Sequence, residues 1–231
     1  CNLINDYADI SLWQSSDEAL AAEVIKSIRL NSFLAIVLTI IASVIGIWLA
    51  AQVGWQLIVI GVLGIIGGYS YTGEPLNYKR LGLGVVATFV FTGVLMVSAA
   101  YYAAAGVWNV NVIFISIPVS FLSSALLLAN EIRDYVDDRR LSIHTLTVRM
   151  GFKFAKYMYA SLLLIVFPVS ILLFFLGLIN NIAYLLPSLL CIYQPVKRLA
   201  CEPGSSDLAG LPQLTGRFYL LFGIGFMLSV T

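Results

Sequence analysis

The sequence predicts an all-α protein, a polytopic bundle of transmembrane helices. Of its 231 residues, 60% are hydrophobic and only 11% are charged, whereas a soluble domain carries about 25% charged residues. Apolar runs recur along the chain, and a run of about 20 such residues spans a bilayer as a helix. Because lipid offers no hydrogen-bond partners to open backbone, the spanning segments must be helical.

Seven apolar spans can be drawn, of which the last two are short. They are Ser32–Ala51, Trp55–Tyr71, Leu83–Ala105, Val112–Ala129, Tyr157–Leu178, Ile182–Val196 and Phe218–Val230.

The positions of the basic residues show how these spans alternate. All 13 Lys and Arg residues lie before the first span or after the second, fourth and sixth spans, and the other connections carry none. This alternation supports seven spans, and the positive-inside rule places the charged face in the cytoplasm. We therefore expect a multi-pass protein of the cell or inner membrane, surrounded by membrane lipid. Its net charge of +1 predicts no nucleic-acid partner.

The first of two acidic clusters opens the chain. If this segment is helical, Asp6 and Asp9 are three residues apart and Asn5 and Asp9 are four apart, so the three side chains share one face. The chain starts at Cys1, inside this motif, and we therefore expect an N-terminal portion to be missing.

The second acidic cluster follows the fourth span. Asn130, Asp134 and Asp138 are successive i, i+4 neighbours, which predicts a stripe of one amide and two carboxylates. Stacked carboxylates repel each other, and Mg²⁺, which prefers carboxylate, water and phosphate oxygens, would relieve that repulsion. Two such stripes at one membrane face predict a receptor for a metal-bound diphosphate. One cluster alone would fit ordinary solvated charges at the membrane edge more readily.

Two further segments carry residues suited to a diphosphate. Between the second and third spans, Lys79 could reach phosphate oxygens, and Tyr71 could present its ring to a cation. The alternative is that they are an interface aromatic and a topology-setting lysine. After the second cluster, Arg149 could bind phosphate, whereas His144 is interpreted as a loop residue.

Four motifs follow one another along the chain. They are Asn-Asp-x-x-Asp at 5–9, Tyr-Thr-Gly-x-Pro-Leu-x-Tyr-Lys-x-Leu-Gly at 71–82, Arg-Asp-x-x-x-Asp-Arg at 133–139 and Thr-Leu-Thr-Val-Arg-Met-Gly at 145–151. Together they resemble the UbiA superfamily of intramembrane prenyltransferases. The last motif is most similar to the menaquinone-pathway branch, which prenylates 1,4-dihydroxy-2-naphthoate.

This resemblance implies nine membrane helices around a lipid-open cavity, with residues 1–231 as a single transmembrane prenyltransferase domain that lacks its first two helices. It implies Mg²⁺ as the cofactor and a polyprenyl diphosphate as the donor. The residues that match metal ligands are Asp6, Asp9, Asp134 and Asp138. The residues that match diphosphate contacts are Asn5, Asn130, Lys79, Arg133 and Arg149.

The implied reaction is Mg²⁺-dependent transfer of the polyprenyl group to an aromatic acceptor. The four aspartates and Tyr71 would be catalytic, with Tyr71 stabilising a carbocation-like prenyl chain. The menaquinone branch implies 1,4-dihydroxy-2-naphthoate, which loses its carboxyl group, as the acceptor. Other acceptors stay open, namely 4-hydroxybenzoate, homogentisate and a lipid alcohol, and so does a membrane transporter as the class of protein.

The sequence departs from the superfamily pattern at two places besides the missing helices. Ser142 stands where a glycine is usual, and residues 11–22 lack the basic residues often found after the first motif. Both departures bear on the acceptor more than on the reaction class.

Overall fold

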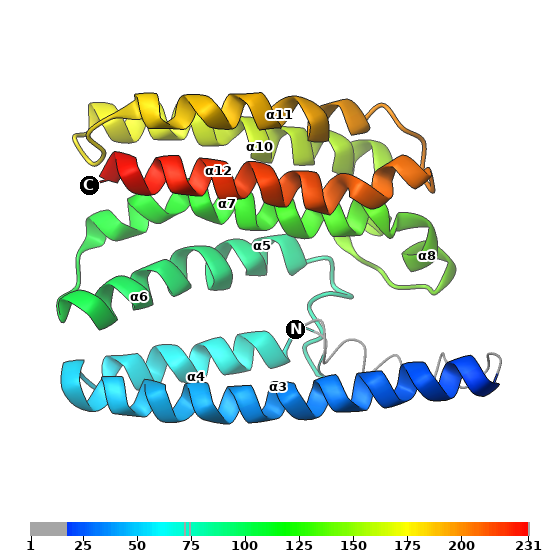
Figure 1. The fold of residues 1–231 in the computed structure, drawn as a ribbon, viewed down its shortest axis with the longest axis horizontal. Helices are drawn as coiled ribbons and strands as arrows, with labels where there is room; N and C mark the ends of the chain where they lie inside the picture. Colours follow the sequence, from blue (N-terminus) through cyan, green and yellow to red (C-terminus); the bar gives the residue numbers. More distant parts are fainter. Residues whose placement is uncertain (1–17, 72, 74, 231) are drawn as a thin grey trace. The chain divides into compact units, whose positions relative to one another are not determined.

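The structure is a computed structural model that describes residues 18–71, 73 and 75–230, and Figure 1 shows its ribbon. Every regular element among these residues is a helix. The first acidic cluster, with Asn5, Asp6 and Asp9, lies outside the described residues. The chain divides into two compact units, residues 1–78 with 102–106 and residues 79–101 with 107–231.

The described part of the first unit is built on two apolar helices, one long and one short. They are α3 (Glu18–Val53) and α4 (Gln56–Tyr69), which pack side by side and run in opposite directions (Figure 1). The chain reverses between them at Gly54. Tyr102, which belongs to this unit, donates a hydrogen bond from its hydroxyl to Oε1 of Gln56 at 2.9 Å. That bond links the first turn of α4 to Tyr102.

The second unit contains the remaining helices. In chain order they are α5 (Gly84–Thr88), the π-helix η1 (Phe89–Leu95), α6 (Met96–Ala105), α7 (Val110–Arg133), α8 (Tyr135–Arg140), α9 (Leu146–Met150), α10 (Phe152–Phe175), η2 (Ile182–Leu185), α11 (Leu186–Arg198), η3 (Ser206–Gly210) and α12 (Leu211–Val230). Helix α6 belongs to this unit only up to Tyr101.

Helix α7 is the centre of the second unit. It begins after Asn109, whose side chain accepts a hydrogen bond from the backbone N–H of Asn111 at 3.0 Å and so caps the helix. It packs against α5, η1, α10 and α12, as Figure 1 shows for α10 and α12. Its fully buried residues Leu122, Leu128 and Ile132 meet residues of α10 and α12 in one apolar core. This packing holds the end of α7, where the second acidic cluster begins.

Each of the seven predicted spans is helical over most of its length, and the all-α transmembrane fold is confirmed. Five helical stretches in the described part of the chain are long and apolar enough to cross a membrane. They are Ile25–Val53, Gly84–Ala105, Val110–Arg133, Phe152–Phe175 and Ser206–Val230. The other two predicted spans, Trp55–Tyr71 and Ile182–Val196, correspond to the 14-residue α4 and to η2 with the 13-residue α11.

Candidate functional site

The predicted stripe of Asn130, Asp134 and Asp138 begins where α7 ends. The backbone N–H of Asp134 donates to the carbonyl of Asn130 at 2.9 Å, and that of Asp138 donates to Asp134 at 2.8 Å. The i, i+4 hydrogen-bond pattern therefore continues through the cluster. Asp134 itself, at φ −89° and ψ 4°, leaves helical geometry and separates α7 from α8.

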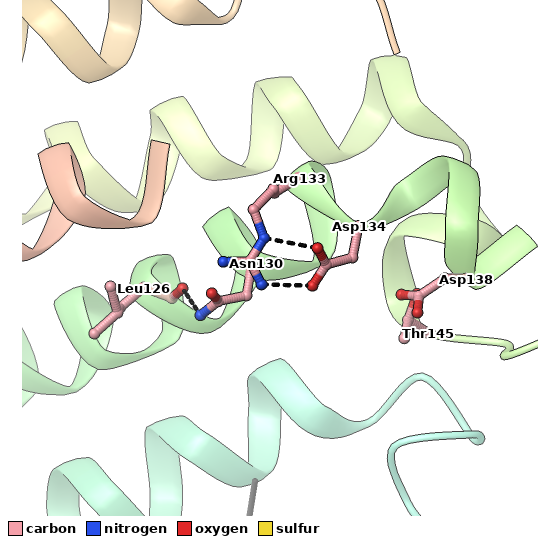
Figure 2. A network of polar contacts seen from close by, with 6 residues as sticks. All are labelled: Leu126, Asn130, Arg133, Asp134, Asp138 and Thr145. Atoms are coloured by element: carbon pink, nitrogen blue, oxygen red, sulfur yellow. Dashed lines mark hydrogen bonds and ion pairs between the residues drawn. The ribbon is translucent and has the colours of Figure 1, made fainter. Parts of the chain in front are cut away.

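This break turns the two carboxylates to different partners (Figure 2). Arg133 donates from Nε and Nη2 to the two carboxylate oxygens of Asp134, at 2.6 and 2.7 Å. Both side chains are about 40% exposed, so the pair contributes at most about 1 kcal/mol to stability. Asn130 donates from its amide to the carbonyl of Leu126 at 3.0 Å. In this structure, an arginine neutralises the charge of Asp134.

Asp138 is buried at the start of α8. Its Oδ2 accepts a hydrogen bond from the hydroxyl of Thr145 at 3.3 Å. Burial raises the pKa of Asp138 to about 6, the positive charge of Lys79 lowers it in part, and the negative charge of Asp134 raises it further. The ionised form of Asp138 is therefore disfavoured in its buried position. A bound cation would stabilise that form.

The prediction from the sequence missed Glu131, the acid that lies deepest at this end of α7. Glu131 is 5% exposed, and its Oε2 accepts hydrogen bonds from the backbone N–H and the hydroxyl of Thr147, at 3.0 and 3.2 Å. The signal that could have identified it was its position only two residues beyond the apolar span that ends at Ala129. Glu131 joins α7 to α9.

Lys79 and Arg149 were both predicted to contact a diphosphate. Lys79 is close enough to Asp138 for its charge to act on that carboxylate. Arg149 donates from Nε and Nη2 to the carbonyl of Arg80, at 3.2 and 2.7 Å, and from Nε to the carbonyl of His144 at 3.1 Å. Lys79, Asp138 and Arg149 thus lie in one region of the second unit, and a phosphate contact by Arg149 stays a prediction.

Tyr71, the predicted cation-stabilising aromatic, belongs to the first unit. It is half-buried, and its ring meets that of Tyr78 edge-on with centroids 5.5 Å apart. The hydroxyl of Tyr78 donates to the carbonyl of Gly67, and burial raises the pKa of Tyr78. Tyr71 therefore rests against an anchored ring.

The carboxylates fit a hard divalent cation by their chemistry. Asp134 and Asp138 supply oxygen donors of the kind that Mg²⁺ prefers, and Mg²⁺ usually takes few protein ligands. Within the described ranges, no group of three or more His, Cys, Asp or Glu residues is arranged to hold a metal ion. The other predicted ligands, Asp6 and Asp9, lie outside those ranges.

An apolar groove lies one helical turn from Asn130. It has a volume of about 440 Å³ and is lined by Leu126, Gly216, Tyr219, Leu220, Gly223, Ile224 and Met227. The hydroxyl of Tyr219 is held 2.8 Å from that of Ser123. Gly216 and Gly223 carry no side chains to fill the space, so the groove can hold an apolar chain.

Comparisons with known proteins identify relatives. A family model described as the UbiA prenyltransferase family matches residues 1–201. The chain is 30% identical, over 165 residues, to the 1,4-dihydroxy-2-naphthoate octaprenyltransferase of Bacillus subtilis. This alignment covers 69% of this chain and 53% of that protein. It is 30% identical, over 179 residues, to a UbiA prenyltransferase domain-containing protein 1 of Dictyostelium discoideum, covering 76% of this chain and 53% of that protein. The chain therefore spans about half the length of these curated relatives.

A solved structure shares the fold. Its title is "Structural and mechanistic insights into the biosynthesis of Digeranylgeranylglyceryl phosphate synthase in membranes", and the match covers 99% of this chain and 80% of that chain. The TM-score is 0.61 and the sequence identity is 18%. At this identity the likeness supports the helical membrane fold alone.

Proposed function

The chain belongs to the UbiA prenyltransferase family, and from that premise we propose that the whole protein transfers a polyprenyl group from a polyprenyl diphosphate to an aromatic acceptor. The observation that carries this proposal is the end of α7. There Asp134 ends the apolar helix α7, the buried Asp138 follows in α8, and the charge of Lys79 acts on Asp138. Acids and a lysine gathered at the end of a membrane helix suit a diphosphate headgroup whose apolar tail stays in lipid.

The acceptor that we propose is 1,4-dihydroxy-2-naphthoate, as in menaquinone synthesis. Relatives with the name 1,4-dihydroxy-2-naphthoate octaprenyltransferase support it, at 30% identity in Bacillus subtilis and 33% in Mycobacterium leprae. In the proposed reaction the C–O bond to the diphosphate breaks, and the diphosphate leaves with its electron pair. A carbon–carbon bond forms between the prenyl chain and the acceptor ring. The carboxylate of the acceptor leaves as CO₂, and the electrons of its bond to the ring restore the aromatic system.

We assign Mg²⁺ to the aspartates of both acidic clusters, namely Asp6, Asp9, Asp134 and Asp138. When bound there, it would neutralise the diphosphate and make it a better leaving group. Asn5, Asn130, Lys79 and Arg133 would orient the diphosphate oxygens. The ring of Tyr71 would stabilise the positive charge that develops on the prenyl chain, by about 0.5–2 kcal/mol.

The apolar surroundings have a role in the same proposal. The groove beside Leu126 begins one turn from Asn130, so a tail that enters it would leave its headgroup near the acids. Exclusion of water from that region would protect the prenyl chain from hydrolysis. The charged connections carry the site, and we place them on the cytoplasmic face by the positive-inside rule.

The proposal is tested on the full-length protein in membranes with Mg²⁺, a labelled prenyl diphosphate and a panel of aromatic acids. Asp134→Ala and Asp6→Ala should each abolish prenyl transfer with expression unchanged. Asp137→Ala removes an exposed acid from the same helix as Asp138 and serves as the matched control. Mass spectrometry of the lipid products identifies the acceptor and the tail. Near-normal turnover by either of the first two variants would contradict the proposed site.

A further inference from the structure

The residues that follow the second acidic cluster form the short helix α9, which is tied to the site on two sides. The first tie is to α7. The buried carboxylate of Glu131 accepts hydrogen bonds from both the backbone N–H and the hydroxyl of Thr147. A buried carboxylate is stable only with such partners, so Glu131 fixes the position of α9. Thr145, which precedes α9, in turn donates to Asp138 at 3.3 Å.

The second tie is to the loop that contains Lys79. Arg149, in the last turn of α9, donates two hydrogen bonds to the carbonyl of Arg80, the residue after Lys79. Its guanidinium also donates to the carbonyl of His144. These bonds hold the loop against α9.

Gly82 makes the second tie possible. Its φ of +74° lies in the region that favours glycine. A Cβ atom at Gly82 would lie 2.7 Å from Cδ of Arg149 and 3.5 Å from Cα of Leu146. A side chain at residue 82 would therefore push the Arg149 side chain out of its place and strain the loop at a positive φ, although the distance to the backbone of Leu146 is an ordinary contact.

We infer that α9 is a brace, and that Glu131 and Arg149 are positioning residues that hold Lys79 near Asp138. The charge of Lys79 acts on both Asp138 and Glu131. Because Lys79 directly precedes Arg80, the position of Lys79 depends on the loop that Arg149 holds. This inference rests on the proposed function, because it gives Lys79 the task of binding the diphosphate. It assigns Arg149 to the carbonyl of Arg80 instead of to phosphate.

The test compares Arg149→Lys and Gly82→Ala in the full-length protein. Arg149→Lys keeps the positive charge but loses the forked pair of donors, and Gly82→Ala leaves every charge in place. Arg140→Lys, at an exposed arginine of α8, controls for the first change. Gly177→Ala controls for the second, because Gly177 also has a positive φ, +69°, but a Cβ there meets nothing within 4 Å.

Two measurements decide the outcome. Trypsin cleavage at the Arg80–Leu81 bond should rise severalfold in both test variants and in neither control, because Arg149 holds the carbonyl of that bond. The KM for the prenyl diphosphate should rise about tenfold in both, as expected when a charged contact is misplaced, while the KM for the aromatic acceptor stays the same. The double variant should have the same KM for the prenyl diphosphate as the more impaired of the two single variants, because both changes break the same contact.

Glu131 provides a further arm. Glu131→Gln keeps an oxygen that accepts hydrogen bonds from Thr147, so its prenyl transfer and its rate of trypsin cleavage should match those of the wild type. Glu131→Met has no such oxygen and should show lower activity and faster cleavage. Unchanged cleavage in Arg149→Lys, or raised cleavage with an unchanged KM for the diphosphate, would overturn the brace. If the wild-type protein shows no prenyl transfer, the proposed function fails, and cleavage then decides the brace alone.

Discussion

At Asp138, burial and the neighbouring carboxylates hold the pKa at about 6, above the ordinary 3.8. The folded protein therefore binds this proton more tightly than the unfolded chain does. The resulting contribution to stability is complete below about pH 4 and is lost as the pH rises through about 6. With divalent cations removed by a chelator, we expect the melting temperature of the purified protein to fall across this window.

Asp138→Asn has no carboxyl group to titrate and isolates this contribution. Its melting temperature should depend less on pH between 4 and 6 than that of the wild type. An equal slope for the two proteins in that window would show that Asp138 titrates normally.

Ser142 lies in the left-handed region, at φ 55°, in the turn between α8 and α9. A side chain there costs about 1–2 kcal/mol relative to glycine. We expect Ser142→Gly to raise the melting temperature and Ser142→Ala, which keeps the Cβ atom, to leave it nearly unchanged. A lower melting temperature for Ser142→Gly would mean that the serine side chain has a compensating role.

The residue types at the site could be predicted from the sequence, but their partners could not. The spacing of Asn130, Asp134 and Asp138 predicts a continuous stripe, and the backbone hydrogen bonds do follow that spacing. Spacing does not reveal that Asp134 leaves helical geometry and pairs with Arg133. It also gives no sign that Glu131 points into the protein, because burial depends on packing between helices.

At the scale of elements, the π-helix η1 packs closely against α7. Gly93 is buried there, and a Cβ atom at this position would lie 2.6 Å from the backbone Cα of Ser120. Because backbone cannot yield as a flexible side chain does, we expect Gly93→Ala to destabilise the protein by about 1–3 kcal/mol. Denaturation in detergent measures this change.

Gly61→Ala is the matched control for Gly93→Ala. Gly61 lies within α4, and a Cβ atom there meets nothing within 4 Å. Alanine should therefore be neutral or stabilising by up to about 1 kcal/mol, through helix propensity. Equal losses of stability at the two positions would refute the packing argument for η1.

Hydropathy predicts that a segment is a helix, but not which kind of helix it is. The predicted span Leu83–Ala105 is helical along Gly84–Ala105, yet seven of its residues form a π-helix. The same hydropathy would suit an ordinary α-helix, because composition does not report the pattern of backbone bonds. For this span, the sequence therefore predicts the presence of a helix but not the π-helical stretch within it.

At the scale of the whole molecule, the alternation of charged and neutral connections predicts which loops share a side of the membrane. Cys201 is a free, half-exposed cysteine in the charged connection between α11 and α12. Asn180 is exposed in the neutral connection after α10. The positive-inside rule places the first in the cytoplasm and the second outside.

A membrane-impermeant maleimide tests this placement in the full-length protein after its other cysteines are replaced by alanine. With Cys201 as the single cysteine, labelling should require permeabilised cells, because the positive-inside rule predicts that the connection on the side of the acidic cluster faces the cytoplasm. With Cys201→Ala and Asn180→Cys combined, intact cells should be labelled. Because one helical segment, η2 with α11, separates the two positions, labelling of both from the same side would show that this segment does not cross the membrane. The reverse pattern would place the carboxylates of α7 and α8 outside the cell, away from a cytoplasmic prenyl diphosphate.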